Sequence, residues 1–364
     1  MLSIIYPHRN RNIKRIERSL RSLQEQSTQD FEVYFVDYGS DKKLALEIEG
    51  LLKGYSFVNY VHYPTYHQPW NKCRALNSVI KHLETDFCFV ADIDMIFHQD
   101  FVKTASSLQE QKTAVYFQVG FLNALETKKD KSFQEYEIDF RSTNEATGLT
   151  MFPVKALQSI KGFDEFYHFW GAEDTDAHVR LKNAGFEVDF YDKKILMLHQ
   201  WHSSYRSKES KKLTKELRLS NAVKLNHQHL KYTVLSNATL VNETGWGNPL
   251  TRESYEELIG YTSEEKILST KKEIIDHFLF HDLAMINHEI RSFIIKPHTK
   301  PKSIKDYLKK MLGKSQAHFY SLKEVNDLIL MQIVTTYRNY DYTLESDITR
   351  NEIRLKIRKS KFHA

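Results

Sequence analysis

The chain has 364 residues, 41% of them hydrophobic, and a formal net charge of +5 at pH 7. This length and apolar content suit one large domain with a smaller one, and the charge is too slight to indicate a nucleic-acid-binding protein. The two cysteines, Cys73 and Cys88, lack metal-ligand spacing, which excludes a disulfide framework and favours a reducing compartment. The sequence begins without a secretory signal pattern, and no apolar run reaches the roughly 20 residues of a membrane span, so we expect a cytoplasmic protein.

The first 200 residues alternate short apolar stretches with amphipathic ones. The apolar stretches predict strands at 2–6, 33–37, 57–63, 87–92 and 114–119. The amphipathic stretches predict helices at 11–26, 41–53, 71–84 and 99–109. Repeated strand–helix–strand order predicts an α/β fold with a mostly parallel central sheet flanked by helices on both faces.

Polar residues follow the predicted strands, at the sheet edge where ligands of such folds bind. They are Pro7-His8-Arg9-Asn10-Arg11 after the first strand, Asp37 after the second, and Asp92 and Asp94 after the fourth. Strand alternation places Asp92 and Asp94 on one face and Ile93 on the other. Such a pair also occurs in phosphohydrolases, calcium loops and surface turns, but a divalent cation, Mg²⁺ or Mn²⁺, is the simplest group to stabilise it here.

Three further clusters carry chemistry. Lys72 and Arg74 stand at the start of the predicted helix 71–84, where a diphosphate would bind well, although either side chain could be a solvated surface charge. The stretch FWGAEDTD (169–176) places an aromatic pair before acidic residues. Acids at a helix start suit the helix dipole, but a ring face and a carboxylate also suit a sugar, and the carboxylate could serve as a general base.

The third cluster is His199 and His202, which lie three residues apart after the strand-like stretch 195–198. A single histidine is usually structural, but two at this spacing after a strand could offer imidazole ligands to a cation beside an aspartate.

The remainder of the chain predicts a different module. Helical periodicity runs through 206–230, 263–293, 302–313, 320–338 and 344–360, with strand-like stretches only at 231–235 and 238–241. We therefore expect a catalytic domain over 1–205 and a mostly helical C-terminal module over 206–364. The closing segment 350–364 is basic, which fits either a solvated helix end or contact with an anionic membrane surface or partner.

Five blocks of the first domain occur together in a recognisable order: PHRNR (7–11), WNKCRALN (70–77), VADIDMI (90–96), GLTMFPVKALQSIKGFDE (148–165) and WGAEDTD (170–176). In this, residues 1–205 resemble the β-1,4-galactosyltransferase family and the wider GT-A fold enzymes of bacteria, including capsule and chondroitin-type polymerase domains. The sequence departs from the family pattern at His8, Ala172 and Thr175.

The resemblance implies a GT-A fold and transfer of galactose or N-acetylgalactosamine from a UDP-sugar to a saccharide or lipid-linked saccharide, with Mn²⁺ or Mg²⁺, in bacterial surface polysaccharide synthesis. It implies a donor site of Pro7, Arg9, Arg11, Asp37, Lys72, Arg74, Asp92, Ile93, Asp94 and Trp170. It implies an acceptor site of Gly148, Trp170, Gly171 and Glu173. It further implies that Asp174 is the catalytic base, assisted by Glu173, and that Asp94, His199 and His202 hold the metal.

Several alternatives stay open at this point. The enzyme could retain rather than invert the anomeric centre, it could hydrolyse a nucleotide sugar without an acceptor, or the chain could be a non-catalytic sugar-nucleotide-binding or scaffold subunit. The C-terminal module could shape the acceptor groove, form a homo-oligomer, or bring the enzyme to the inner face of the cell membrane.

Overall fold

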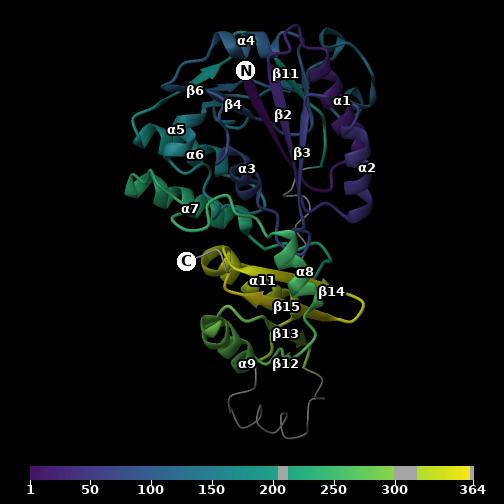
Figure 1. Cartoon of the computed structure of the whole chain (residues 1–364), viewed down its shortest axis with the longest axis vertical. Helices are drawn as coiled ribbons and strands as arrows, with labels where there is room; N and C mark the ends of the chain where they lie inside the picture. The colour runs from purple at the N-terminus through teal and green to yellow at the C-terminus, as the bar shows by residue number, and fades with distance from the viewer. Residues whose placement is uncertain (204–211, 299–317, 361–364) are drawn as a thin grey trace, which may run out of the picture. The chain divides into compact units, whose positions relative to one another are not determined.

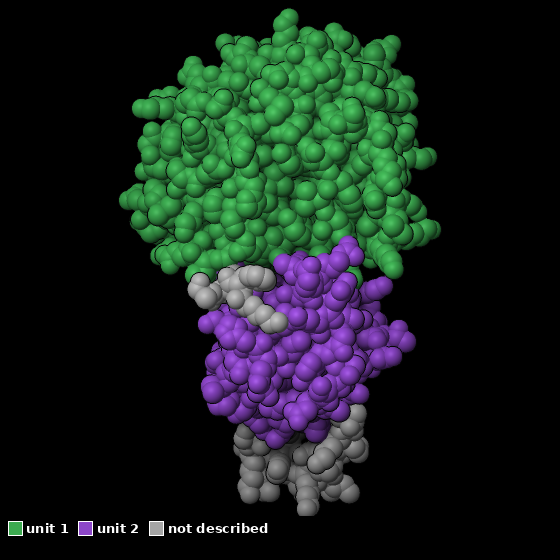
Figure 2. Space-filling view, in the orientation of Figure 1, with its two compact units in different colours: residues 1–66, 70–207, 222–249 green, residues 67–69, 208–221, 250–364 purple. Residues whose placement is uncertain are grey.

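The computed structural model describes residues 1–203, 212–298 and 318–360. The chain forms two compact units, shown in different colours in Figure 2. Unit 1 comprises Met1–Tyr66, Trp70–Ser207 and Ala222–Pro249, and unit 2 comprises His67–Pro69, Lys208–Asn221 and Leu250–Ala364. The chain passes from unit 1 to unit 2 close to the predicted boundary at residue 205. Unit 1 also includes residues 222–249, however, which we had placed in the C-terminal module.

Unit 1 is built on a seven-stranded sheet with the order β10-β6-β9-β4-β1-β2-β3 (Figure 1). Its strands are β1 (Leu2–His8), β2 (Phe31–Tyr38), β3 (Val58–Tyr63), β4 (Phe87–Val90), β6 (Thr113–Phe117), β9 (Thr150–Pro153) and β10 (Glu187–Tyr191). Only β9 runs antiparallel to its neighbours, β4 and β6. The mostly parallel sheet and its five predicted strands are thus confirmed.

Helices cover both faces of this sheet (Figure 1). They are α1 (Ile13–Gln24), α2 (Lys42–Leu52), α3 (Lys72–Ile80), α4 (Phe101–Ser107), α5 (Val154–Ser159) and α6 (Glu173–Asn183), and a further helix, α7 (Ala222–Ser236), packs on α6. Because side chains alternate along β1, Ile4 joins α1 and α4 in one hydrophobic cluster, and Ile5 joins α3, α5 and α6 in the other. The predicted α/β architecture, with helices on both faces of the sheet, is therefore present.

Unit 1 also contains a smaller sheet, which brings polar residues to the end of β4. Its order is β5-β11-β7-β8, with β5 (Met95–Phe97), β11 (Met197–His199), β7 (Gly120–Phe121) and β8 (Phe140–Arg141). Antiparallel pairing of β5 with β11 sets His199 opposite Met95. Residues separated by a hundred positions are thereby brought to the end of β4.

Unit 2 contains a four-stranded sheet, which corrects the prediction of a mostly helical module. The strands are β12 (Glu265–Ser269), β13 (Arg291–Lys296), β15 (Glu352–Arg358) and β14 (Asp341–Asp347), in that spatial order. The helices of this unit include α8 (Arg252–Gly260), α9 (Lys272–His277) and α11 (Leu322–Gln332), and α11 confirms the predicted helix 320–338. The predicted helix 344–360 is wrong because Ile353, Leu355 and Ile357 alternate with polar residues and are buried as the inner face of a strand.

Other predictions for this part of the chain also need correction. The predicted helix 263–293 contains β12, α9 and the start of β13. The predicted strand 231–235 lies within α7, where Thr233 donates a hydrogen bond to Asp176 of α6, so tertiary contact overrides strand propensity. The predicted helix 302–313 lies outside the described residues, as does the first part of 206–230.

The described part of the basic closing segment, residues 350–360, makes contacts within unit 2. Arg354 pairs with Glu352, Lys356 donates to the carbonyls of Ile259 and Tyr261, and Arg358 pairs with Asp341. None of the described helices combines the length and apolar content needed to cross a bilayer.

Candidate active site

Asp94, His199 and His202 converge where β4 ends. Asp94 directly precedes β5, and the pairing of β5 with β11 brings His199 beside it. His202 Nε2 lies 3.1 Å from Asp94 Oδ2, and His199 Nε2 lies 3.7 Å from Asp94 Oδ1. Asp94 is 3% exposed and its Oδ1 atom accepts no hydrogen bond. A buried carboxylate oxygen without a partner is costly, which marks this as a place for a further charged group.

Asp94, His199 and His202 shift the pKa values of one another. Burial alone would raise the pKa of Asp94, but the hydrogen bond from His202 and the charges of His199 and Arg11 outweigh it and lower that pKa to about 2. The hydrogen bond to Asp94 raises the pKa of His202, whereas burial lowers the pKa of His199. Asp94 is therefore ionised at neutral pH, as a metal ligand must be.

The donor atoms fit a divalent ion. One ligand atom from each of Asp94, His199 and His202 lies within 4.8 Å of the others. One carboxylate with two imidazoles suits several first-row divalent metals, and three protein ligands leave positions for phosphate oxygens or water.

Lys72 stands at the centre of a second cluster. It is the first residue of α3, after the cap residue Asn71, whose side chain accepts from the backbone N–H of Arg74. Its Nζ atom lies 3.1 Å from Asp174 Oδ2, 3.4 Å from Glu173 Oε1 and 3.7 Å from Asp92 Oδ1. Asp92, half exposed, stands two residues from Asp94 and so links the two clusters.

One ammonium group faces three carboxylates, and these contacts shift the pKa of Lys72 and the pKa of Asp174. Burial raises the pKa of Asp174, Lys72 lowers it, and Glu173 and Asp92 raise it again, to about 7. Burial opposes the charge on Lys72, but Asp174, Asp92 and Glu173 outweigh burial and hold the pKa of Lys72 well above its usual value. A carboxylate that titrates near neutrality is suited to accept a proton from an alcohol.

The loop before α6 is held in an uncommon backbone conformation. Phe169, Gly171 and Ala172 have φ values of +68°, +103° and +74°, in the left-handed region that non-glycine residues rarely adopt. The Gly171 N–H donates to Glu173 Oε2 at 2.8 Å, and the Trp170 side chain is about half exposed. The surrounding contacts thus fix a strained loop that presents an indole ring beside the carboxylates.

Two contacts support this loop from other parts of unit 1. The buried amide of Asn226 in α7 donates to the carbonyl oxygens of His168 and Trp170. Thr147 and Thr175 are hydrogen-bonded at 2.7 Å, which joins the segment before β9 to α6. A Cβ atom placed on the adjoining Gly148 would lie 3.4 Å from Asp174 Oδ2, so Gly148 borders the proposed base.

Four residues of the predicted donor site, Pro7, Arg9, Arg11 and Asp37, lie at the ends of β1 and β2. Pro7 is buried within β1, while Arg11 is exposed. The Arg9 guanidinium donates to the carbonyls of Tyr38 and Thr65, and buried Asp37 accepts from the Ser40 N–H and the Tyr60 hydroxyl. Arg9 and Asp37 therefore hold the shape of this edge, and any contact with a nucleotide stays a prediction.

The structure does not bring Arg74 into the cluster around Lys72. Arg74 is 5% exposed, and its Nε atom donates to Glu165 Oε2 at 2.6 Å. Glu165 also accepts from Asn77 and from the Gly247 N–H. Asp176 is likewise structural, because its carboxylate accepts from Arg180 and Thr233 inside the core. Ile93 is buried, but Ile93 and Asp94 lie in a turn after β4, so the strand alternation predicted for this stretch is wrong.

Sequence reasoning missed the residues that position this site. Glu165 lies inside the block 148–165, but its role depends on Arg74 and Asn77, which are about 90 residues away in the sequence. Asn226 lies in the segment that we had placed in another domain. The role of neither residue can be seen in the local sequence, so only the fold could identify them.

Two family models match the chain. Residues 3–161 match "Glycosyl transferase family 2", and residues 127–203 match "N-terminal domain of galactosyltransferase". No curated protein matches the sequence.

Solved structures of glycosyltransferases are similar at low identity. TarS 1–349 of S. aureus is 13% identical, with 100% of this chain and 98% of that chain covered and a TM-score of 0.47. A mannosyltransferase from Pyrobaculum calidifontis, solved with GDP-Man and Mn²⁺, is 17% identical, with 55% and 56% covered and a TM-score of 0.41. GalNAc-T7, solved with UDP, GalNAc and Mn²⁺, is 11% identical, with 64% and 48% covered and a TM-score of 0.47.

The chain thus spans about half the length of the mannosyltransferase and of GalNAc-T7. The two family matches together run from residue 3 to residue 203, across the large sheet and both clusters described above. These matches support a glycosyltransferase.

Proposed function

We propose that this protein transfers a sugar from a UDP-sugar to a hydroxyl group of a saccharide acceptor, with a divalent cation and with inversion at the anomeric carbon. The observation that carries the proposal is the position of Asp174. Its carboxylate contacts Lys72, borders Gly148 and belongs to the same cluster as Asp92, which stands two residues from Asp94. A base for an alcohol and a site for a cation are therefore neighbours.

Asp94, His199 and His202 would hold the cation, Mn²⁺ or Mg²⁺. When bound, the cation would neutralise negative charge on the donor diphosphate. The partnerless Oδ1 atom of Asp94 and the two imidazoles are the observations that support this assignment.

Asp174 would accept the proton of the acceptor hydroxyl as that oxygen attacks the anomeric carbon. Its raised pKa makes it a stronger base than an exposed aspartate. Glu173, whose Oε2 atom accepts from the Gly171 N–H, would orient the acceptor together with the face of Trp170. Lys72 would stay charged throughout and stabilise negative charge that develops on the leaving group.

Direct attack from the face opposite the leaving group inverts the anomeric centre. The match of residues 127–203 to a galactosyltransferase model supports galactose or N-acetylgalactosamine as the sugar. A role in bacterial surface polysaccharide synthesis in the cytoplasm rests on the resemblance described above. Contact with an anionic membrane has less support, because Arg354, Lys356 and Arg358 are engaged within unit 2.

The test is a thermal-stability screen of nucleotide sugars with and without Mn²⁺, since a ligand that binds the native state raises its melting temperature. We expect a UDP-sugar to stabilise the protein only when Mn²⁺ is present. The stabilising donor is then incubated with saccharide acceptors, and NMR of the product reports its anomeric configuration. Release of free sugar at a rate that acceptors do not change would contradict a transferase, and a retained configuration would contradict direct attack.

A further inference from the structure

Unit 2 contains a second group of metal-type donor atoms, contributed by His277, His281 and Asp282. One ligand atom of each residue lies within 4.8 Å of the others. All residues of the candidate active site belong to unit 1, so the function proposed above does not use this group. We propose that His277, His281 and Asp282 bind a transition-metal ion of borderline character, of which Zn²⁺ matches the donor atoms best.

The backbone explains how one segment presents three ligands on one side. Helix α9 ends at His277 and continues as a π-helical turn, η4 (Phe278–Asp282), after which the Leu283 N–H donates to the carbonyl of Phe278. In a regular α-helix, Asp282 would lie about 140° around the axis from His277. Hydrogen bonds from residue i to residue i+5 widen the turn and return residue i+5 to the side of residue i. The π-turn thus brings Asp282 to the two imidazoles.

The distances between the donor atoms favour a shared ion. Nδ1 of His277 and Nδ1 of His281 lie 3.4 Å and 3.5 Å from Oδ1 of Asp282, and the two imidazole ring centres are 4.5 Å apart. A typical N–H···O hydrogen bond is shorter, at about 2.9–3.0 Å between heavy atoms. Two ligands bound to Zn²⁺ at about 2.0–2.1 Å in tetrahedral geometry are about 3.4 Å apart. The spacing therefore fits common coordination better than direct hydrogen bonding.

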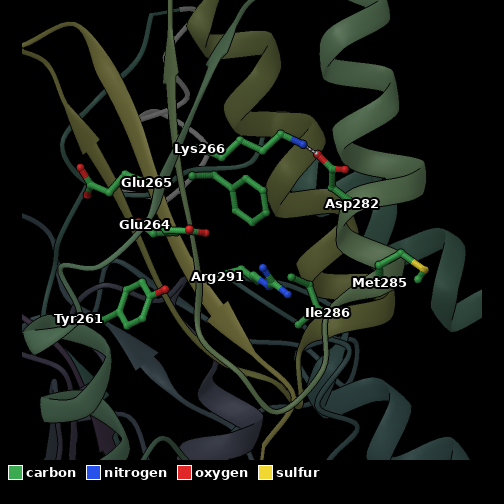
Figure 3. A pocket seen from close by; sticks show the side chains of 10 residues that line it. Tyr261, Glu264, Glu265, Lys266, Asp282, Met285, Ile286 and Arg291 are labelled. Carbon is green, nitrogen blue, oxygen red and sulfur yellow. Dashed lines mark hydrogen bonds and ion pairs between the residues drawn. The ribbon is translucent and has the colours of Figure 1, made fainter.

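The second oxygen of Asp282 is already fixed. Oδ2 accepts from Lys266 of β12 at 2.6 Å, as Figure 3 shows, which leaves Oδ1 turned toward the imidazoles. Asp282 is 13% exposed, whereas His277 and His281 are more than half exposed. An outer hydrogen bond that orients a ligating carboxylate is a common feature of protein metal sites.

Asp282 also borders a cavity of about 450 Å³, with Tyr261, Lys266 and Arg291 among its other lining residues (Figure 3). Three protein ligands leave one tetrahedral position for water or for an anionic group of a ligand in this cavity. Aspartate with two imidazoles suits Zn²⁺, Ni²⁺ or Cu²⁺ rather than the all-oxygen environment that Ca²⁺ requires.

The test is to count bound Zn²⁺ on the full chain by isothermal titration calorimetry and native mass spectrometry. We expect two equivalents on the wild type and one on the double variant His277→Ala/His281→Ala. Asp94→Ala should remove the other equivalent, and combining all three substitutions should abolish binding. His288→Ala, which changes another exposed histidine of unit 2, is the matched control and should keep both equivalents.

The exposure of both imidazoles makes loss of the fold by these substitutions an implausible explanation, and circular dichroism checks it. The single variant His281→Gln should weaken this site at least tenfold. Retention of both equivalents by the double variant, or equal loss in His288→Ala, overturns the proposal. Because the readout is metal stoichiometry, its failure leaves the proposed transferase activity untouched.

Discussion

The ammonium nitrogen of Lys72 lies 3.1 Å from Oδ2 of Asp174, in a cluster where the same ammonium also meets Glu173 and Asp92. One cation cannot neutralise three carboxylates, of which Glu173 and Asp174 are largely shielded from water. The ionisation of Asp174 is therefore opposed by its neighbours, although Lys72 favours it. This balance raises the pKa of Asp174 to about 7, which suits the proposed role of general base.

Replacing Asp174 with asparagine should remove the base while keeping the shape of the site. We expect transfer to fall by about 10²- to 10⁴-fold, the usual contribution of a positioned general base. Binding of UDP in the presence of Mn²⁺ should change little, because Asp94, His199 and His202 are intact. Calorimetry with UDP and a product assay separate the two effects. The exposed Glu145→Gln is the control, and full activity in Asp174→Asn would show that the base lies elsewhere.

Replacing Asp94 with alanine should have a different signature. The change removes the one carboxylate that faces both His199 and His202, so binding of Mn²⁺ and binding of the UDP-sugar should weaken together. The measurement is the rise in melting temperature that Mn²⁺ and UDP produce, compared with Asp139→Ala at an exposed position. An unaltered dependence of activity on Mn²⁺ would place the cation at other residues.

The pH dependence of the reaction should report Asp174. Only its ionised form accepts a proton, and its pKa is raised to about 7 by burial and by Glu173 and Asp92. We therefore expect kcat/KM to rise with pH and to level off above an apparent pKa near 7. The profile should be measured with saturating Mn²⁺ at each pH, so that protonation of the histidines is not limiting. A flat profile between about pH 5 and pH 8 would argue against this carboxylate as the base.

The two cations near the start of α3 should behave differently when they are removed. Arg74→Ala leaves Glu165 buried without its cation, and we expect a loss of about 3–5 kcal/mol in the free energy of unfolding. The folded fraction should keep its KM for the donor. Lys72→Met should instead reduce kcat with a smaller loss of stability, since Lys72 lies at the more open cluster. Denaturant unfolding and steady-state kinetics distinguish the pair; a large rise in donor KM for Arg74→Ala would return that residue to the donor site.

The sequence was most informative where a motif directly follows a buried strand. The stretch around Asp92 and Asp94 is such a case, because it directly follows β4, although Ile93 and Asp94 form a turn to which the predicted strand alternation does not apply. His199 was identifiable for the same reason, since it ends a strand of its own. Their meeting in space follows from the pairing of β5 with β11, to which local patterns contribute nothing.

Elsewhere, local patterns could not show which side of a helix faces the core, or whether a segment forms a helix or a strand. Lys72 and Arg74 are two residues apart on a helix and point to different sides, and only the position of Glu165 shows which side is the core. In unit 2, charged residues recur at helix-like spacing through 344–360. The alternation of buried apolar and polar residues in β15 was therefore read as a helix. The π-turn after α9 depends on packing and had no sequence signal that we could read.

The passage of residues 222–249 back into unit 1 constrains how the protein can be divided. Asn226 and Thr233 of α7 hold the Trp170 loop and Asp176, and Asn242 donates to the backbone of Phe163. A polypeptide ended near residue 205 would lack all of these groups, so a polypeptide that contains the whole of unit 1 must extend to Pro249. A fusion that replaces the C-terminal module must therefore place its junction after residue 249, and the unit 2 segments 67–69 and 208–221 would stay with the first partner.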